Sequence, residues 1–531
     1  MRNGVILGAA TAIGLSLVGC VVSGDGGGAS ASHAGGGRSA GADISVDALR
    51  ANLELLAADE LGGRSAGTPG YEAAAEFVEV ELANHGVDPL FASSADALSY
   101  RQPFGLANWR VARGGSMTID SREPDELALL QDMQVAYIGD TAAWGKDLPV
   151  VFVGSGVVEQ DLGVDELAGL DLDGACAALF FDLPAQMLAS GPPGLRARNP
   201  QGNQGLERRV ANVAERGAVC VIALPGLQPP VFWREFLTAP NQLQGQSRTP
   251  DPAQPFVGFA VGISDRGAAT LFAGQIGDPN LDPTLDPFAL TDTTVRFDLE
   301  LRDGGILETA NIGGVIPGTD SDLEDEVIVL SAHLDGQGTQ ANGVVLNSAN
   351  DNAASVVALL EAARHLARAP GRRPVMVLFT SAEELGLFGS EHFVDNPPVP
   401  FSSLALNVNM EMVGKRRRSF GGYQFRVSGR HSDEIETLVT ATRDRHGDVD
   451  FDYERRFETP DYQFRRADHV RFFLRGVPTI YFYGGGEDYH QPSDDANRIE
   501  YEKVRTMAEV LVDLIRVTDT MASLPKSDGR S

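Results

Sequence analysis

From about residue 295 to near the end of the chain, short apolar segments alternate with amphipathic ones. The segments "EVIVLSAHLDG", "PVMVLFTSAEE", "LALNVNMEMVG" and "VPTIYFYGG" have the length of buried strands, and "NDNAASVVALLEAARHLARA" and residues 431–446 predict helices. Buried strands that alternate with helices predict an α/β domain, in which a mostly parallel mixed sheet has helices on both faces. In such sheets, functional groups gather at the carboxyl ends of the strands.

Side chains that can bind a metal follow four successive strands of this predicted sheet. They are His333 and Asp335, Asp351 at the start of the next helix, Glu383 and Glu384, Glu411, and His490. One such group at a strand end is explained by contact with water, but a whole series along one sheet predicts a metal site. Two imidazoles and several carboxylates with no nearby Cys suit a catalytic zinc site or pair, and cobalt or manganese less well.

Glu383 and Glu384 are adjacent at the end of an apolar strand, where two carboxylates repel each other and lose hydration. A centre with two metal ions needs a bridging carboxylate and a free carboxylate that takes a proton from water. A metal that neutralises one of these acids and leaves the other free explains the pair.

Two further regions precede the predicted sheet. Residues 45–86 predict two amphipathic helices around the loop "GGRSAGTPG", with Ser45 as an N-cap, and "SYRQPF" (99–104) predicts a short strand. Residues 131–290 carry short apolar runs between Gly, Pro and polar loops, which predicts a separate, small, β-rich domain. Its two cysteines, Cys176 and Cys220, form a disulfide or remain two buried thiols, because spacing alone does not show whether they meet.

The N-terminal residues have the features of an export signal. Arg2 precedes an apolar run of about 15 residues, which is shorter than the roughly 20 that span a membrane. "LVGC" resembles the lipobox of bacterial lipoproteins, in which the cysteine, here Cys20, is lipidated; an ordinary signal peptide with an incidental cysteine is the alternative. The Gly- and Ser-rich residues 21–43 predict a flexible tether. We therefore expect residues 1–20 to direct export and Cys20 to anchor the protein to the membrane of a bacterial cell envelope, periplasmic or at the cell surface.

The formal net charge of −30 limits the partners of the protein. Non-specific binding to nucleic acid needs clustered Lys and Arg, so we expect no nucleic-acid partner. The dense basic run "KRRRS" (415–419) is expected to form a solvated loop, with contact to an acidic substrate as the alternative.

Several motifs stand in the order found in one enzyme family. "SAHLDG", "NSANDNAASVVALLE", "FTSAEELGLFGSEHF", "NVNMEMVG", "DHVRFFLRGVPTIYF" and "DYHQPSDD" resemble the zinc aminopeptidases of the M28 type. The resemblance implies the zinc-exopeptidase (phosphorylase/hydrolase-like) fold for residues 44–130 and 291–522. Residues 131–290 resemble, in pattern, an inserted protease-associated domain. The implied activity is that of a zinc-dependent exopeptidase, an aminopeptidase acting on peptides with a free N-terminus.

The resemblance also implies a role for each candidate residue. Two zinc ions would be bound by His333, Asp351 as the bridging carboxylate, Glu384, Glu411 and His490. The general base would be Glu383, and Tyr489 would stabilise the oxyanion. Asp335 would orient the His333 imidazole, and Asp494 would support the ligands from behind. A cis peptide bond is implied between Asp351 and Asn352.

Glu411 departs from the family pattern, which usually has Asp at this position. Glu keeps the charge and the donor type but reaches one methylene further, so the metal shared with His333 would be bound more weakly or differ in kind. A mononuclear enzyme, such as a glutaminyl cyclase of the same fold, is therefore an alternative. A non-catalytic receptor on this fold is another, although all five ligand positions keep a competent donor.

Overall fold

A computed structural model describes residues 44–524, apart from 95–96, 139–142, 185–186, 188–189, 200–202, 226–236, 238–258, 276, 278–281, 283, 341, 417–424, 430–431, 447–450 and 454–465. The expected signal peptide, Cys20 and the tether lie outside the described residues. No helix in the described part of the chain is both long and apolar enough to cross a membrane.

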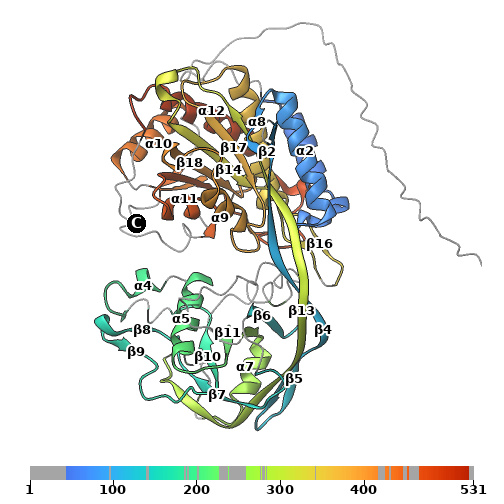
Figure 1. Cartoon of the computed structure of the whole chain (residues 1–531), viewed down its shortest axis with the longest axis vertical. Coiled ribbons are helices and arrows are strands. Elements are labelled where there is room, and N and C mark those ends of the chain that lie inside the picture. Colours follow the sequence, from blue (N-terminus) through green and yellow to red (C-terminus); the bar gives the residue numbers. More distant parts are fainter. Residues whose placement is uncertain are drawn as a thin grey trace, which may run out of the picture. The chain divides into compact units, whose positions relative to one another are not determined.

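The C-terminal part of the chain is built on a mixed sheet (Figure 1). Its strands are β13 (Phe288–Ile316), β14 (Val327–His333), β17 (Val375–Thr380), β18 (Leu404–Glu411), β19 (Phe425–Ser428), β20 (Phe451–Tyr453) and β21 (Thr479–Tyr483). They lie side by side in the order β20-β19-β21-β18-β14-β17-β13. The central strands β17, β14, β18 and β21 are parallel, whereas β13 pairs with β17, and β19 with β21, in antiparallel fashion.

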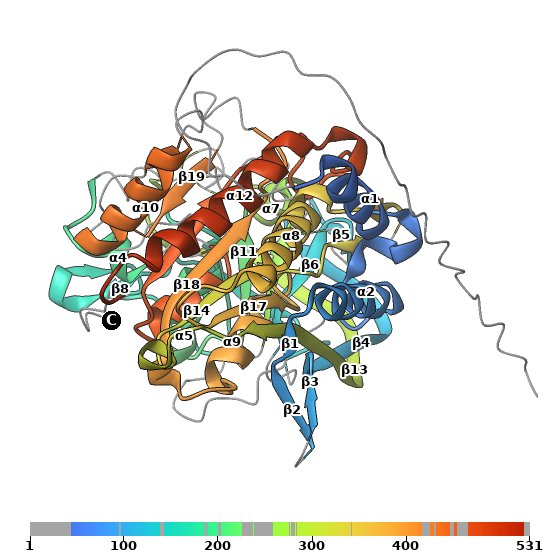
Figure 2. The same ribbon diagram turned by 90° about the horizontal axis from the view of Figure 1, so that it is seen from above.

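Helices cover both faces of this sheet, because the central strands are apolar on both sides. Ile328 and Leu330 of β14 pack into one core cluster with residues of α1 (Val46–Leu56), α2 (Pro69–His85), α8 (Ala354–Arg368), α10 (Asp433–Arg445) and α12 (Tyr501–Thr518). Val327 and Val329, which point the other way, pack with α9 (Phe388–Asp395) and α11 (His469–Leu474). Figure 2 shows α8 and α12 lying across the strands.

The two N-terminal helices begin at polar caps. The hydroxyl of Ser45 accepts the N–H of Ala48 at the start of α1, as predicted, and Thr68 caps α2 in the same way. Between them, η1 (Asp59–Arg64) includes the first three residues of the predicted loop "GGRSAGTPG", and α2 begins at its Pro69.

A long two-stranded ribbon follows these helices. The strand expected at 99–104 is the beginning of β4 (Arg101–Asp120), which pairs antiparallel with β13 from Ile312↔Arg101 to Thr294↔Asp120. The C-terminal end of β13 also pairs with β17, and its N-terminal end with β7 (Leu148–Phe152). One strand thus belongs both to the sheet described above and to the strands of the inserted segment.

The inserted segment has its own strands and core. It contains β5 (Asp125–Ala128), β6 (Met133–Ile138), β10 (Cys176–Phe180), β11 (Cys220–Leu224), β12 (Phe259–Ile263), α5 (Asn203–Glu215) and α7 (Asp265–Leu271). Strands β7, β10, β11 and β12 are parallel, and β6 joins β12 antiparallel. One of its core clusters includes Met117 and Ile119 of β4 and Val295 and Phe297 of β13, so this core extends beyond residues 131–290. The remaining short elements are β1 (Asp88–Pro89), β2 (Phe91–Ser94), β3 (Ala97–Ser99), β8 (Val158–Glu159), β9 (Val164–Asp165), α4 (Leu195–Arg198), β15 (Gly338–Thr339) and β16 (Val345–Leu346).

Cys176 and Cys220 are joined by a disulfide. They are directly paired residues of the neighbouring parallel strands β10 and β11, with Cα atoms 4.6 Å apart. Both side chains are fully buried. The register of the two strands thus settles the question that the sequence spacing left open.

Lys503 of α12 is a buried amine, 3 % exposed. Its Nζ donates to the carbonyl oxygen of Lys415 and lies 4.9 Å from the centre of the Phe425 ring. Burial lowers its pKa from 10.5 to about 7; the nearby Glu500 acts against this shift and the nearby Arg416 adds to it. Between pH 7 and 10.5, the unfolded chain therefore binds a proton that the folded protein lacks, so this residue makes stability rise with pH.

We expect Lys503→Met to remove this pH dependence. Between pH 7 and pH 9, the free energy of unfolding of the wild type should rise by about 2 kcal/mol relative to that of the variant. Urea unfolding of both proteins at the two pH values measures the change. Lys146→Met, which replaces an exposed lysine, is the control. The assignment would be wrong if the free energy of unfolding of each variant differed from that of the wild type by the same amount at pH 7 and at pH 9.

Candidate metal centre

Most of the predicted site residues meet at the carboxyl ends of the parallel strands. His333 is the last residue of β14, and Glu411 is the last residue of β18. Glu383 and Glu384 follow β17 after a short turn, and His490 lies in the loop after β21. Because these strands are parallel and adjacent, their ends lie along one edge of the sheet, as the strand-end argument predicts.

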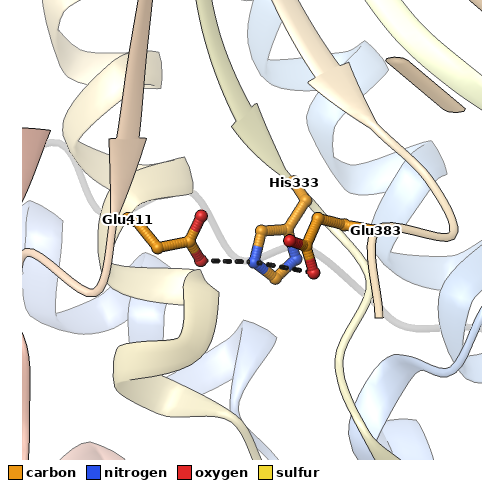
Figure 3. A group of neighbouring side chains, drawn as sticks. All are labelled: His333, Glu383 and Glu411. Carbon is orange, nitrogen blue, oxygen red and sulfur yellow. Dashed lines mark hydrogen bonds and ion pairs between the residues drawn. The ribbon is translucent and has the colours of Figure 1, made fainter. Parts of the chain in front are cut away.

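The first cluster consists of His333, Glu383 and Glu411 (Figure 3). The Nε2 atom of His333 lies 2.7 Å from Oε1 of Glu411 and 4.0 Å from Oε2 of Glu383. Figure 3 shows both carboxyl groups directed toward the imidazole from neighbouring strands. Their oxygen and nitrogen atoms are close enough together to bind one ion.

The second cluster consists of Asp351, Glu384 and His490. Nε2 of His490 lies 3.4 Å from Oδ2 of Asp351 and 3.2 Å from Oε2 of Glu384. The other oxygen of Asp351, Oδ1, lies 3.3 Å from Nε2 of His333 in the first cluster. Asp351 therefore reaches both clusters, which is the position of a bridging carboxylate. The Asp351–Asn352 peptide bond is cis, as the family resemblance implies.

The electrostatics of the site favour a bound cation. Burial raises the pKa of Glu411 to about 8 and the pKa of Glu383 well above its usual value. Burial lowers the pKa of His490, but the Glu384 and Asp351 carboxylates outweigh it and bring it to about 10. Burial also acts to raise the pKa of Asp351, yet His333 and His490 hold it below its ordinary range.

Two buried carboxylate oxygens in this site have no hydrogen-bond partner among the described residues. They are Oε1 of Glu384 and Oε2 of Glu411. A buried carboxylate oxygen without a partner is unfavourable, and a divalent cation between the acids and imidazoles would satisfy both atoms. The residues present thus fit a metal ion with nitrogen and oxygen ligands.

Asp335 contacts the site through both its backbone carbonyl and its carboxylate. Nδ1 of His333 lies 3.0 Å from the backbone oxygen of Asp335 but 3.7 Å from its carboxylate, so the backbone carbonyl orients the imidazole. The carboxylate accepts the backbone N–H groups of Glu383 and Glu384, at 3.2 Å each. The carboxylate also lies within ion-pair distance of the ring, so the predicted role of Asp335 in orienting His333 stays a prediction, with the backbone carbonyl as a second contact.

Asp494 lies behind the ligands, as predicted. Its carboxylate accepts the N–H groups of Asn350 and Asp351 at 3.0–3.1 Å, and Lys415 donates to it at 2.8 Å. Lys415 also pairs with Asp488 at 3.0 Å and is buried, so the expectation of a solvated loop was wrong for this lysine. Its charge is needed inside because the buried Asp494 and the partly buried Asp488 face it.

Tyr489 lies against the second cluster. Its ring stacks on His490 with the ring centroids 3.6 Å apart. Nη2 of Arg466 donates to the Tyr489 hydroxyl at 3.0 Å. Burial raises the pKa of Tyr489 well above its usual value, and Arg466 partly opposes this. Arg466 was not predicted as a site residue, since neither composition nor spacing marks it.

Two further residues near the ligands were also missed. Arg64 is fully buried and donates to the backbone oxygens of Leu334, Leu56, Asn347 and Ser348, which fastens the loops that follow His333 and precede Asp351. Gln337 contacts Glu384 Oε2 through its amide nitrogen, which also lies 2.9 Å from His490 Nε2. The glycines around Arg64 predicted only a loop, and nothing marked Gln337.

Comparisons with known proteins find similar sequences. A model of "Peptidase family M28" matches residues 311–515. An aminopeptidase of Pseudomonas aeruginosa (strain UCBPP-PA14) is 25% identical over 444 residues, which are 82% of this chain and 69% of the relative. Aminopeptidase YwaD of Bacillus subtilis is 26% identical over 195 residues, 35% of this chain and 40% of the relative.

Solved structures show the same fold. An aminopeptidase from Aneurinibacillus sp. strain AM-1 superposes with a TM-score of 0.58 at 18% identity, covering 91% of this chain and 95% of that one. A zinc aminopeptidase from Bacillus subtilis superposes with a TM-score of 0.55 at 18% identity, covering 90% and 95%. Residues 311–515 therefore resemble peptidase family M28 in sequence, and the chain shares the fold of these aminopeptidase structures.

Proposed function

We propose that the protein is a zinc-dependent aminopeptidase, which removes N-terminal residues from peptides. The observation that carries this proposal is the pair of ligand clusters that share Asp351, with Glu383 beside them. The names of similar proteins support it: the Pseudomonas relative is called an aminopeptidase, and the Bacillus subtilis structure a zinc aminopeptidase.

Two zinc ions fit the residues present. His333, Asp351 and Glu411 would bind one ion, and Asp351, Glu384 and His490 the other. Imidazole and carboxylate ligands without thiolate are the set that catalytic zinc takes in hydrolases. When bound, zinc lowers the pKa of water and polarises a carbonyl group.

Glu383 would act as the general base. Its carboxyl group adjoins His333 but is not needed as a ligand, since Asp351 already reaches the same imidazole at 3.3 Å. The carboxylate takes a proton from the attacking water and passes it to the nitrogen of the leaving amine. The backbone N–H of Glu383 is held by Asp335, which fixes the turn that presents this side chain.

Tyr489 donates a hydrogen bond to the oxyanion of the tetrahedral intermediate. Arg466 already donates to the Tyr489 oxygen, so the phenolic hydrogen is free to point at the substrate. Stacking on His490 fixes the ring beside the second cluster. A protonated substrate amine is attracted by the carboxylates of this cluster, which favours cleavage next to a free N-terminus.

The N-terminal residues and residues 131–290 also have proposed roles. Cys20 would carry a lipid anchor in a bacterial cell envelope, with residues 21–43 as the tether to the enzyme. Residues 131–290 would form a protease-associated domain. These proposals rest on sequence patterns, and mass spectrometry of the N-terminal peptide from cell membranes tests the lipid on Cys20.

A substrate panel with metal analysis tests the proposed activity. We expect hydrolysis of aminoacyl p-nitroanilides, and a loss of roughly 10- to 100-fold in kcat/KM when the amine is acetylated, since a charged hydrogen bond is lost. Metal analysis should give two zinc ions per chain. Cyclisation of N-terminal Gln with one zinc would instead indicate a glutaminyl cyclase, and peptide binding without turnover would indicate a receptor.

A further inference from the structure

A pocket of about 320 Å³ lies beside the metal centre. Two segments form its walls: residues of η1 and the start of α2, and the loop that follows His333. Its lining includes Glu60, Leu61, Ser65, Thr68, Pro69 and Gln337. The mechanism proposed above uses none of them.

The two walls are fastened to each other and to the site. Arg64 donates to the carbonyl oxygens of Leu334 and Ser348 at 3.1 and 3.0 Å, and its own carbonyl accepts the N–H of Gly336 at 3.2 Å. The walls approach closely, since a Cβ at Gly63 would lie 2.6 Å from the carbonyl oxygen of Gly338. Gly63 also has a φ of +73°, which favours glycine. The pocket is thus a built feature of the fold.

Gln337 connects the pocket to the metal ligands. It lines the pocket, and its amide nitrogen lies at Glu384 and 2.9 Å from His490. One side chain therefore separates the pocket from the second cluster. A substrate residue bound with its backbone at that cluster can direct its side chain into this pocket.

The lining gives the chemistry of that side chain. Leu61 and Pro69 are apolar, and Ser65 and Thr68 carry hydroxyl groups. Glu60 is the charged residue in the lining, and its exposed carboxylate has no ion-pair partner among the described residues. An apolar wall with a free carboxylate matches a long aliphatic side chain that ends in a positive charge.

We propose that this pocket binds the side chain of the substrate's N-terminal residue, and that Glu60 gives it a preference for Lys and Arg. The assignment of the pocket to the N-terminal residue rests on the proposed aminopeptidase activity. It goes further by naming the substrate class and the residue that selects it.

The test compares Glu60→Gln and Glu60→Lys with the wild type. We expect kcat/KM for Lys- and Arg-p-nitroanilide to fall about three- to tenfold in Glu60→Gln, and further in Glu60→Lys, because an exposed ion pair is lost and then reversed. The value for Leu-p-nitroanilide should stay within about twofold. Glu76→Gln, at an exposed acid of α2 outside the pocket lining, is the matched control and should change neither.

A binding measurement separates this proposal from the proposed activity. Calorimetry with L-arginine and L-norleucine, both without a bond to cleave, should show tighter binding of arginine that Glu60→Gln abolishes. Arginine binding that depends on Glu60 in a protein without peptidase activity would keep the pocket and overturn the activity. Turnover without a Glu60-dependent preference at the N-terminal residue, or a preference only at the next residue in Leu-X dipeptides, would overturn the pocket assignment. Absence of both turnover and arginine binding would overturn it as well.

Discussion

Glu383→Gln should lower kcat by about 10²- to 10⁴-fold while the protein keeps its zinc. Glutamine has nearly the same shape as glutamate but cannot take a proton from water, so the variant isolates proton transfer from packing. Steady-state kinetics and metal analysis of the same preparation measure both effects. The loss should appear in kcat rather than in KM, because proton transfer contributes only in the transition state.

The same substitution also tests whether Glu383 is a metal ligand. Glu383 groups with His333 and Glu411 closely enough to be a ligand itself. If Glu383→Gln loses one zinc ion, Glu383 is a ligand and the base must be sought elsewhere. Glu391→Gln, in α9 a few residues further along the chain, is the control for removing one acid nearby and should keep both activity and metal.

Glu384→Gln should lose metal first and activity as a consequence. The apparent binding free energy of a zinc ion in a four-ligand protein site is about 10–16 kcal/mol, or about 3 kcal/mol per ligand, so affinity should fall about a hundredfold or more. Dialysed protein should then contain about one zinc ion fewer than the wild type. Zinc analysis after dialysis against a weak chelator measures this.

Added zinc distinguishes the two neighbouring acids. Excess zinc should restore much of the activity of Glu384→Gln, because the amide oxygen and the remaining ligands still form a site. It should leave Glu383→Gln inactive, because no metal replaces a missing base. Rescue of both variants, or of neither, would contradict the division of roles between these acids.

The clustering of the candidate ligands was predictable because it depends on local pattern and one general rule. Each ligand follows an apolar strand or opens a helix, and parallel strands bring their ends to one edge of the sheet. The family resemblance added the roles of Glu383 and Glu384 and the cis bond after Asp351, which the structure contains.

The missed features depend on contacts between distant segments. Arg64 reaches backbone oxygens more than 270 residues away in sequence, Lys415 is buried because Asp488 and Asp494 come to it from another loop, and the Gln337 amide meets His490 across 153 residues. No local pattern encodes such contacts. The length of β4 was missed for the same reason, since its pairing partner β13 lies about 180 residues further along the chain.

The shared ribbon of β4 and β13 determines how the enzyme can be shortened. Deleting residues 131–290 would leave Met117, Ile119, Val295 and Phe297 on the ribbon without the core that now covers them. A deletion that leaves no such surface would remove the chain between Ala107 and Ile306, which face each other in the two strands, and would join the strands there by a tight hairpin turn. The boundary of the segment that contains residues 131–290 is thus a pair of facing residues within a sheet. The segment extends from the end of a two-stranded ribbon and is not joined to the rest of the chain by flexible linkers.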